Sequence, residues 1–250
     1  MTSGSLYDRP DLYDLMAPRD PALELFYLNQ ARTGNGSVLD LACGSGRLSL
    51  PLAQAGHQVV GGDASAPMLG RARDAAIAAD LDIAFVELDM RDFDLGGRRF
   101  DTIIVAANAF LHLLGADEQR GFLLSVRNHL APEGQLVFDI FVPGLEILTR
   151  DPNRRYDVGT VQHPEHGTVR VDETHRYDPI DQVSNVIWFW STATQPDFWV
   201  TPFRLRQIFP RELPLILELG GMRLCDRFGG FDRSPFSEES WRQVCVCEAL

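Results

Sequence analysis

Residues 38–63 constrain the fold more than any other stretch of this 250-residue chain. They read VLDLACGSG, RLSLPLAQAG and HQVVGGD: an apolar strand, a glycine-rich turn, a helical segment and a second apolar strand. The strands carry the acids Asp40 and Asp63 at or near their ends. Small turn residues let a ligand approach the backbone, and an acid after the second strand suits ribose hydroxyls. The stretch therefore predicts a nucleoside-binding crevice in an α/β sheet.

The spacing of the turn residues distinguishes between nucleotide cofactors. A dinucleotide turn reads G-x-G-x-x-G, but Gly44 and Gly46 are followed by Ser49 where the third glycine would stand. The observed order, acid-x-small-x-Gly-x-Gly, resembles motif I of the class I S-adenosylmethionine-dependent methyltransferases. The resemblance extends through residue 141. An NAD-binding oxidoreductase is the alternative. Two features count against it: the third glycine is absent, and there is no Tyr-x-x-x-Lys pair.

The resemblance implies S-adenosyl-L-methionine as the cofactor and S-adenosyl-L-homocysteine as its product. In that family the turn packs against the amino-acid part of the cofactor, the second acid holds the ribose, and residues after the third strand contact adenine. The cofactor-binding residues implied here are Asp40, Ala42, Gly44, Gly46, Asp63, Ala64, Met68, Asp89, Met90, Arg91 and Ala107. Ala42 replaces the family's usual first glycine.

Strand and helix patterns alternate through most of the chain. Three segments with a two-residue period interrupt this alternation, at 169–177, 183–192 and 199–208. We expect a seven-stranded Rossmann-like, doubly wound α/β sheet with its last strand antiparallel and a small antiparallel β insertion after the fifth strand. The expected parts are an N-terminal lid and cofactor-binding core (1–142), the insertion as a substrate or oligomer lobe (143–209) and a return to the core sheet (210–250).

The residues before the first strand predict a helix and a turn. Asp20 and Pro21 start a helix that runs to Ala31, with Leu25 and Leu28 on its inner face, and residues 33–36 form a turn. In many small-molecule methyltransferases this part of the chain forms a lid whose aromatic residues reach the methyl group. The tyrosines here either do so or pack the helix down.

Methyl transfer from a sulfonium is an in-line displacement that requires alignment of donor and acceptor. An ammonium or hydroxyl acceptor must also lose a proton, which a histidine can accept. Resemblance to sugar N,N-dimethyltransferases implies His112 and Tyr13 as catalytic residues; alternatively, His112 caps the following helix or stabilises the fold. The predicted substrate-binding residues are Tyr13, Asn108, Trp188, Trp190, Arg204 and Phe231. The tryptophans bind a ring-bearing or sugar-like acceptor or form a homodimer contact.

Composition excludes several other classes. The net charge is −12, from 35 acidic and 23 basic residues, which disfavours nucleic acid as a partner. All 23 bases are arginine, so lysine chemistry is excluded. A magnesium site of the catechol type needs acids after the fourth and fifth strands, and only Asp139 is near, so we predict no metal. No apolar run approaches the roughly 20 residues that a membrane-spanning helix needs, and the N-terminal residues lack an apolar secretory core, so a cytoplasmic protein without membrane contact is expected. A non-catalytic cofactor-binding or scaffold protein remains an alternative.

Overall fold

The computed structural model describes residues 2–31 and 36–250, so most of the turn expected at 33–36 lies outside the described residues. The chain divides into two compact units, each with its own sheet. The smaller unit comprises residues 1–18 and 143–207, and the larger comprises residues 19–142 and 208–250. Both units are therefore discontinuous in sequence.

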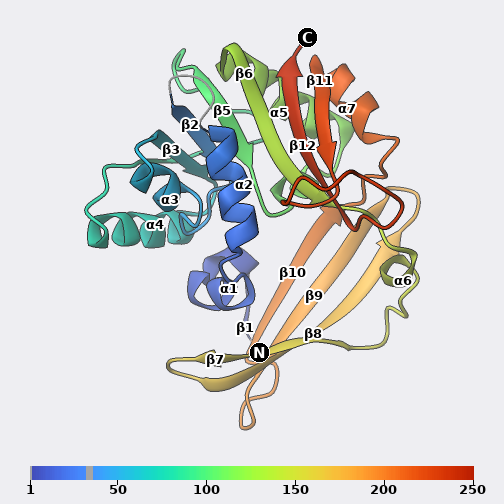
Figure 1. Cartoon of the computed structure of the whole chain (residues 1–250). Helices are drawn as coiled ribbons and strands as arrows, with labels where there is room; N and C mark the ends of the chain where they lie inside the picture. Colours follow the sequence, from blue (N-terminus) through green and yellow to red (C-terminus); the bar gives the residue numbers. More distant parts are fainter. Residues whose placement is uncertain (1, 32–35) are drawn as a thin grey trace. The chain divides into compact units, whose positions relative to one another are not determined.

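The larger unit contains a seven-stranded sheet in the order β11-β12-β6-β5-β2-β3-β4 (Figure 1). Its strands are β2 (Ser37–Leu41), β3 (Gln58–Asp63), β4 (Ala84–Glu87), β5 (Phe100–Val105), β6 (Leu130–Phe141), β11 (Met222–Phe228) and β12 (Arg242–Ala249). β12 pairs antiparallel with both of its neighbours, whereas the pairs among β2 to β6 are parallel. The predicted seven-stranded sheet with an antiparallel last strand is confirmed.

Helices cover this sheet and form a shared core with it. They are α2 (Pro21–Ala31), α3 (Ser49–Gln54), α4 (Ala66–Ala78), the 3-10 helix η2 (Ala109–His112), α5 (Ala116–His129) and α7 (Leu213–Leu219). Val38, Ile104 and Val137 from three adjacent strands are fully buried, because interior parallel strands are covered on both faces.

Helix α2 begins and ends as the sequence predicts. The Asp20 carboxylate accepts hydrogen bonds from the amides of Ala22 (3.0 Å) and Leu23 (3.2 Å), as an N-terminal cap does. Its buried face carries Phe26 and Tyr27, however, and Leu25 is 58% exposed. The expectation that Leu25 points inward is wrong, because two large rings one position further on occupy the core-facing side.

The smaller unit has a five-stranded sheet in the order β1-β10-β9-β8-β7. Its strands are β1 (Thr2–Ser3), β7 (Tyr156–His163), β8 (Gly167–Asp178), β9 (Val183–Ser191) and β10 (Trp199–Arg206), with the short helices η1 (Leu6–Asp8), α1 (Pro10–Met16) and α6 (Leu145–Leu148). The strands β7 to β10 are antiparallel neighbours, and β1 joins β10 in parallel. The antiparallel insertion is confirmed, with β7 added to the three strands that the sequence predicts.

One face of this smaller sheet holds an aromatic core. Trp190 is fully buried, and its indole nitrogen donates a hydrogen bond to Thr201 Oγ1 (3.1 Å). The rings of Trp188 and Trp190 lie 5.9 Å apart, so both project from the same face of β9. Leu6 and Leu12, from the N-terminal helices, pack into the same cluster. The helices η1 and α1 thus contribute to the core of the smaller unit.

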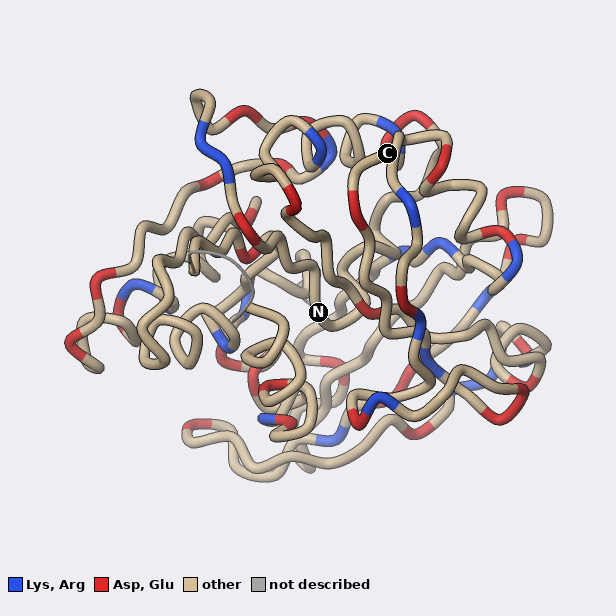
Figure 2. The backbone as a smooth tube through the Cα atoms, turned by 45° about the horizontal axis from the view of Figure 1, so that its top comes forward, with Lys and Arg blue, Asp and Glu red and all other residues tan. Residues whose placement is uncertain are grey.

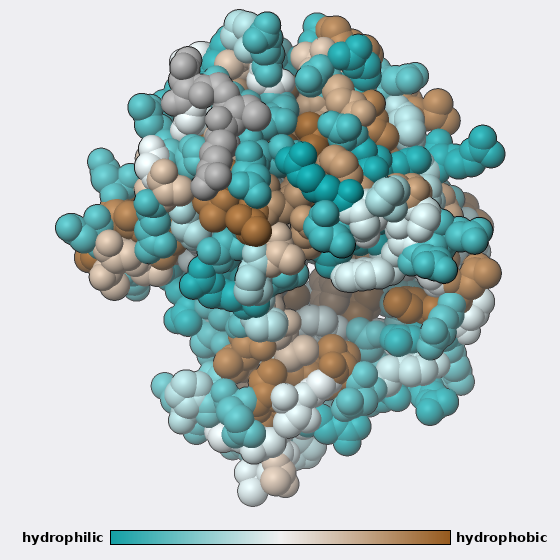
Figure 3. All heavy atoms as spheres, in the orientation of Figure 1, coloured by the Kyte–Doolittle hydropathy of each residue, from teal (hydrophilic) through white to brown (hydrophobic). Residues whose placement is uncertain are grey.

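Charged and apolar side chains are dispersed over the surface. Acidic and basic residues alternate along the backbone in Figure 2, and the face in Figure 3 is mostly hydrophilic with small hydrophobic areas. Among the described residues, no helix is both long enough and apolar enough to span a membrane.

Candidate functional site

The candidate site lies in the larger unit, at the carboxyl ends of β2, β3, β4 and β5. Ala42, Gly44 and Gly46 in the turn after β2 have φ values of 53°, 56° and 84°. Glycine adopts this left-handed conformation freely, whereas alanine pays about 1–2 kcal/mol for it. A β-carbon on Gly46 would lie 2.6 Å from Leu50 Cδ1, so the Leu50 side chain would have to shift to admit one. A β-carbon on Gly44 would meet no atom within 4 Å, which leaves its backbone open to a ligand.

Asp63, at the end of β3, is held by the same turn. Its Oδ2 accepts a hydrogen bond from the Gly44 amide (2.8 Å), and its Oδ1 accepts one from the Ser65 amide (2.8 Å). Partial burial raises the pKa of this carboxyl, and the backbone hydrogen bonds act in the opposite direction. Each oxygen keeps a further lone pair for an external donor. The result is an oriented acid beside an open stretch of backbone.

Asp40 is placed inside the unit, where it braces the turn from within. Only 2% of its surface is exposed, and the Ser49 hydroxyl donates a hydrogen bond of 2.6 Å to its Oδ2. Burial raises the pKa of Asp40 to about 7, the Ser49 hydrogen bond opposes that rise, and the charge of Asp63 adds to it. Met68 is likewise fully buried on α4, whereas Ala64 is exposed. Any role of Asp40 or Met68 toward a ligand is therefore exerted through neighbouring groups.

Asp89 lies at the same sheet edge as Asp63. β3 and β4 pair in parallel with Asp63 opposite Glu87, so Asp89 follows two residues beyond that position. Its carboxylate accepts hydrogen bonds from the Arg91 backbone amide (3.0 Å) and from Arg91 Nε (2.8 Å). The Arg91 side chain lowers the pKa of Asp89 mainly through this hydrogen bonding. The half-buried Met90 lies between the two.

The corner after β5 carries the next group of predicted residues. Ala107 and Asn108 have φ values of 56° and 64°, so two successive non-glycine residues adopt the left-handed conformation. Such positions cost about 1–3 kcal/mol each and persist only when their surroundings hold them. Asp139 Oδ1 accepts a hydrogen bond from the Ala107 amide (2.8 Å), and Asn108 Oδ1 accepts one from the Phe141 amide (2.8 Å). From the sequence, Asp139 is considered only as a metal ligand. The pattern that could have indicated its structural role is a single acid within the apolar run LVFDIF.

His112 is half-buried at the end of η2, directly after this corner. The two preceding residues, Phe110 and Leu111, are fully buried and anchor the short helix. The ring of Phe110 stacks on Phe138 of β6 with 5.0 Å between centroids. A proton-accepting side chain is thereby placed at the edge of the sheet that also carries Asp63 and the open turn.

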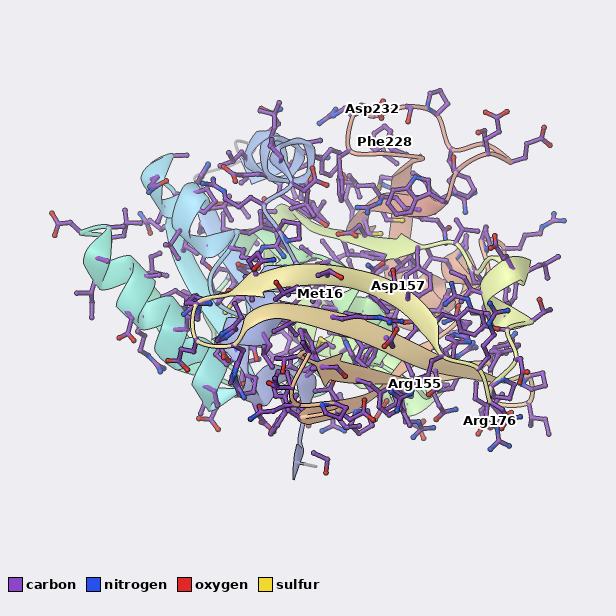
Figure 4. All side chains as sticks on the ribbon, turned by 90° about the horizontal axis from the view of Figure 1, so that it is seen from below. Met16, Arg155, Asp157, Arg176, Phe228 and Asp232 are labelled. Carbon is purple, nitrogen blue, oxygen red and sulfur yellow. The ribbon has the colours of Figure 1, made fainter. Side chains whose placement is uncertain are left out.

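The predicted substrate-binding residues are divided between the two units. Phe231 lies in the loop after β11, between Phe228, the last residue of β11, and Asp232, both of which are labelled in Figure 4. The Arg242 guanidinium lies 4.3 Å from the Phe231 ring centroid. Tyr13, Trp188, Trp190 and Arg204 belong to the smaller unit.

Within the smaller unit these four side chains differ in exposure. Tyr13 packs beside Tyr7 with 5.6 Å between ring centroids, and Trp188 Nε1 donates to Glu173 Oε2 (3.0 Å). Arg204 is exposed, and Trp190 has no exposed surface. Their roles stay predictions.

Metal-ligating side chains do not gather in the part of the chain that the structure describes. No group of three or more histidine, cysteine, aspartate or glutamate residues with metal-binding geometry occurs within residues 2–31 and 36–250. The acid nearest the fourth and fifth strand ends, Asp139, is engaged with backbone amides.

A sheet of this order, with a glycine-bearing turn and an acid at the next strand end, defines the class I methyltransferase fold. A family model described as a methyltransferase domain matches residues 38–134, the region that contains the turn, Asp63, Asp89 and His112. The chain therefore contains a methyltransferase domain with the class I fold, and the predicted family resemblance is confirmed.

Several known proteins resemble the chain over its whole length. The cypemycin N-terminal methyltransferase of a Streptomyces species is 27% identical over 99% of both chains. Among solved structures, the CcbJ methyltransferase from Streptomyces caelestis has a TM-score of 0.84 at 29% identity over 98% of both chains. The sugar N-methyltransferase KedS8 from Streptoalloteichus sp ATCC 53650 has a TM-score of 0.71 at 22% identity, covering 98% of this chain and 94% of its own.

Other curated relatives match only about half of the chain, 42–52% of its length. Those with 32–37% identity align over 42–48% of their own length. The chain thus shares less than half of the length of these relatives, and the likeness that spans both units comes from proteins of lower identity.

Proposed function

We propose that the chain is an S-adenosylmethionine-dependent methyltransferase that moves a methyl group to a nitrogen or oxygen atom of a small molecule. The observation that carries this proposal is Asp63, oriented by the Gly44 amide at 2.8 Å, beside a glycine on which an added β-carbon would meet no atom within 4 Å. This pair suits a ligand with a ribose diol next to a compact polar chain. The cofactor supplies a methyl group on a sulfonium, which needs alignment more than activation.

The cofactor-binding roles follow from the strand ends. Asp63 accepts hydrogen bonds from the ribose hydroxyls, and the turn from Ala42 to Gly46 contacts the amino-acid part. Asp89 and Met90 recognise adenine, with Arg91 holding the Asp89 carboxylate in place. Asp40 and Met68 support the turn and α4 from inside the unit.

A nitrogen acceptor on a sugar or a specialised metabolite is favoured within this proposal. The relative that matches 99% of the chain is named an N-terminal methyltransferase, and the structurally similar KedS8 is named a sugar N-methyltransferase. An amine that is protonated in solution must lose a proton before it attacks, and His112 serves as the base. Asn108 and Phe231, which belong to the same unit as His112, orient the acceptor.

Replacement of Asp63 by alanine tests the proposal directly. The variant is expected to bind S-adenosylmethionine about 10- to 100-fold more weakly, the scale of losing charge-assisted hydrogen bonds. Isothermal titration calorimetry on the folded variant provides the measurement. Glu87→Ala is the matched control, because Glu87 is an exposed acid opposite Asp63 in the strand register and has no assigned contact. Unchanged affinity in Asp63→Ala would remove this residue from the site.

A parallel titration separates the proposed class from its alternatives. Wild-type protein should bind S-adenosylhomocysteine and give no saturable heat with NAD, since the turn lacks the third glycine of a dinucleotide site. Binding of NAD alone would replace the methyltransferase proposal with an oxidoreductase. Binding of S-adenosylhomocysteine without transfer to any acceptor would favour the non-catalytic alternative.

Transfer is also expected to be independent of added metal. The proposed chemistry uses a methyl group that is already activated, and Asp139 is committed to the Ala107 amide. Turnover in the presence of EDTA should therefore equal turnover without it, measured with an acceptor identified from a co-purifying ligand. Loss of activity in EDTA and its return with magnesium would contradict this expectation.

A further inference from the structure

We propose that Asp139 is a positioning residue that holds the corner after β5 and thereby fixes the place of His112. The inference rests on the proposed function, in which His112 is the base for the acceptor. It concerns a side chain that lies in the middle of the fold and is itself out of reach of any ligand, with 1% of its surface exposed.

The corner contains two residues that would not adopt their backbone conformation unaided. Ala107 and Asn108 both have left-handed φ values, 56° and 64°, and each carries a β-carbon that disfavours this region. Asp139 Oδ1 accepts a hydrogen bond of 2.8 Å from the Ala107 amide. The bond from the Phe141 amide to Asn108 Oδ1 (2.8 Å) runs in the reverse direction. β6 and the corner are therefore joined reciprocally, and these bonds offset the backbone strain.

The Asp139 carboxylate is itself fixed by two other elements. The Tyr27 hydroxyl on α2 donates to its Oδ1 (2.8 Å), and Arg242 Nη1 on β12 lies 3.5 Å from its Oδ2. Burying an acid in an apolar strand is expensive, and an apolar residue of similar size would serve packing at a lower cost. The groups gathered around Asp139 thus fit a role in specifying backbone geometry better than a role in stability.

The corner transmits its geometry to His112 through one short helix. The Ala109 amide donates to the Ala106 carbonyl (3.2 Å), and the Leu111 amide donates to the Asn108 carbonyl (2.9 Å). The ring of Phe110, two residues before His112, stacks on Phe138, which is the residue before Asp139 in β6. A change in the conformation of the corner would therefore displace the imidazole, while the Asp63 and Asp89 strand ends would stay in place.

The proposal is tested by NMR of the full chain labelled with ¹⁵N in its six histidines. The His112 signal is assigned from a His112→Gln variant. In Asp139→Leu, which removes both acceptor oxygens at similar side-chain size, we expect the His112 signal to shift or broaden while the other five keep their positions. The dissociation constant of S-adenosylhomocysteine should stay within about threefold of the wild type. Tyr27→Phe is the matched control: it removes the hydroxyl from Asp139 but leaves both bonds to the corner, so the His112 signal should not move.

Two further variants distinguish positioning from general stability. Ala107→Gly in the Asp139→Leu background should return the His112 signal toward its wild-type position, since glycine adopts the left-handed conformation without strain. Asn108→Ala should move the signal with Asp139 and Arg242 intact, and it decides the question if Asp139→Leu does not fold. An unmoved His112 signal in the folded variants, or equal shifts of all six histidines without recovery in Ala107→Gly, would overturn the inference. Failure of wild-type protein to bind S-adenosylhomocysteine would instead refute the proposed function.

Discussion

His112→Ala is expected to lower turnover by about 10²- to 10⁴-fold, the range over which general bases contribute, while cofactor affinity stays nearly unchanged. The reason is its location: His112 ends the helix after β5, whereas the proposed ribose and adenine contacts, Asp63 and Asp89, lie at the ends of β3 and β4. Single-turnover transfer to an identified acceptor and calorimetry with S-adenosylhomocysteine measure the two quantities separately. The difference in turnover between wild type and His112→Ala should become smaller as the pH rises, because more of the acceptor is then deprotonated in solution.

A histidine that only supports the fold would give a different result. His112→Ala would then lower the melting temperature and weaken cofactor binding together, while the folded fraction would keep its full turnover. His112→Gln is the matched control, because glutamine preserves hydrogen-bonding capacity and bulk but cannot take up a proton at neutral pH. Equal turnover of wild type and His112→Gln would show that alignment alone carries the transfer.

The second large effect concerns Asp40 and pH. An acid whose pKa is higher in the folded chain than in the unfolded one binds its proton more tightly when folded. The free energy of unfolding therefore falls as the pH rises through the interval between the two values. For Asp40 that interval runs from about 4 in the unfolded chain to about 7 in the folded chain. The associated loss of stability is up to about 4 kcal/mol.

Asp40→Asn should remove this loss. The asparagine still offers an oxygen to the Ser49 hydroxyl, which donates at 2.6 Å in the wild type, but it carries no charge at any pH. The melting temperature of the variant relative to the wild type should therefore increase from pH 5 to pH 8. Asp74→Asn, at an exposed position on α4, is the control and should show no such trend. A constant difference between Asp40→Asn and wild type across this range would contradict the expectation.

The larger sheet could be predicted because its signals are local. Interior parallel strands read as short apolar runs, and the turn after the first of them needs small residues at fixed positions. The strands β8, β9 and β10 were also predictable, since their side chains alternate with a period of two. β7 escaped prediction because only its last residue, His163, is buried. A register shift between Asp157 and Gly159 also breaks the alternation of its side chains.

The features that could not be predicted depend on contacts between distant residues. β1 is two residues long and pairs with β10 through Thr2 and Trp199, so no local pattern marks it. The candidate site likewise depends in part on contacts between residues that are distant in the sequence. Its glycines and acids follow a spacing that can be recognised, whereas the Asp139 network unites residues from α2, the corner after β5, β6 and β12. The residues that contact a ligand at a strand end can be predicted from the sequence, whereas the hydrogen bonds that hold them in place cannot.

The pairing of Thr2 and Ser3 with Trp199 and Val200 has a consequence for synthesis on the ribosome. β1 is translated almost 200 residues before β10, the strand with which it pairs. Until β8 and β9 are translated, Leu6 and Leu12 lack the side chains against which they pack. Apolar side chains exposed in this way favour aggregation of a folding chain. The smaller unit can therefore be completed only after β10 has been synthesised.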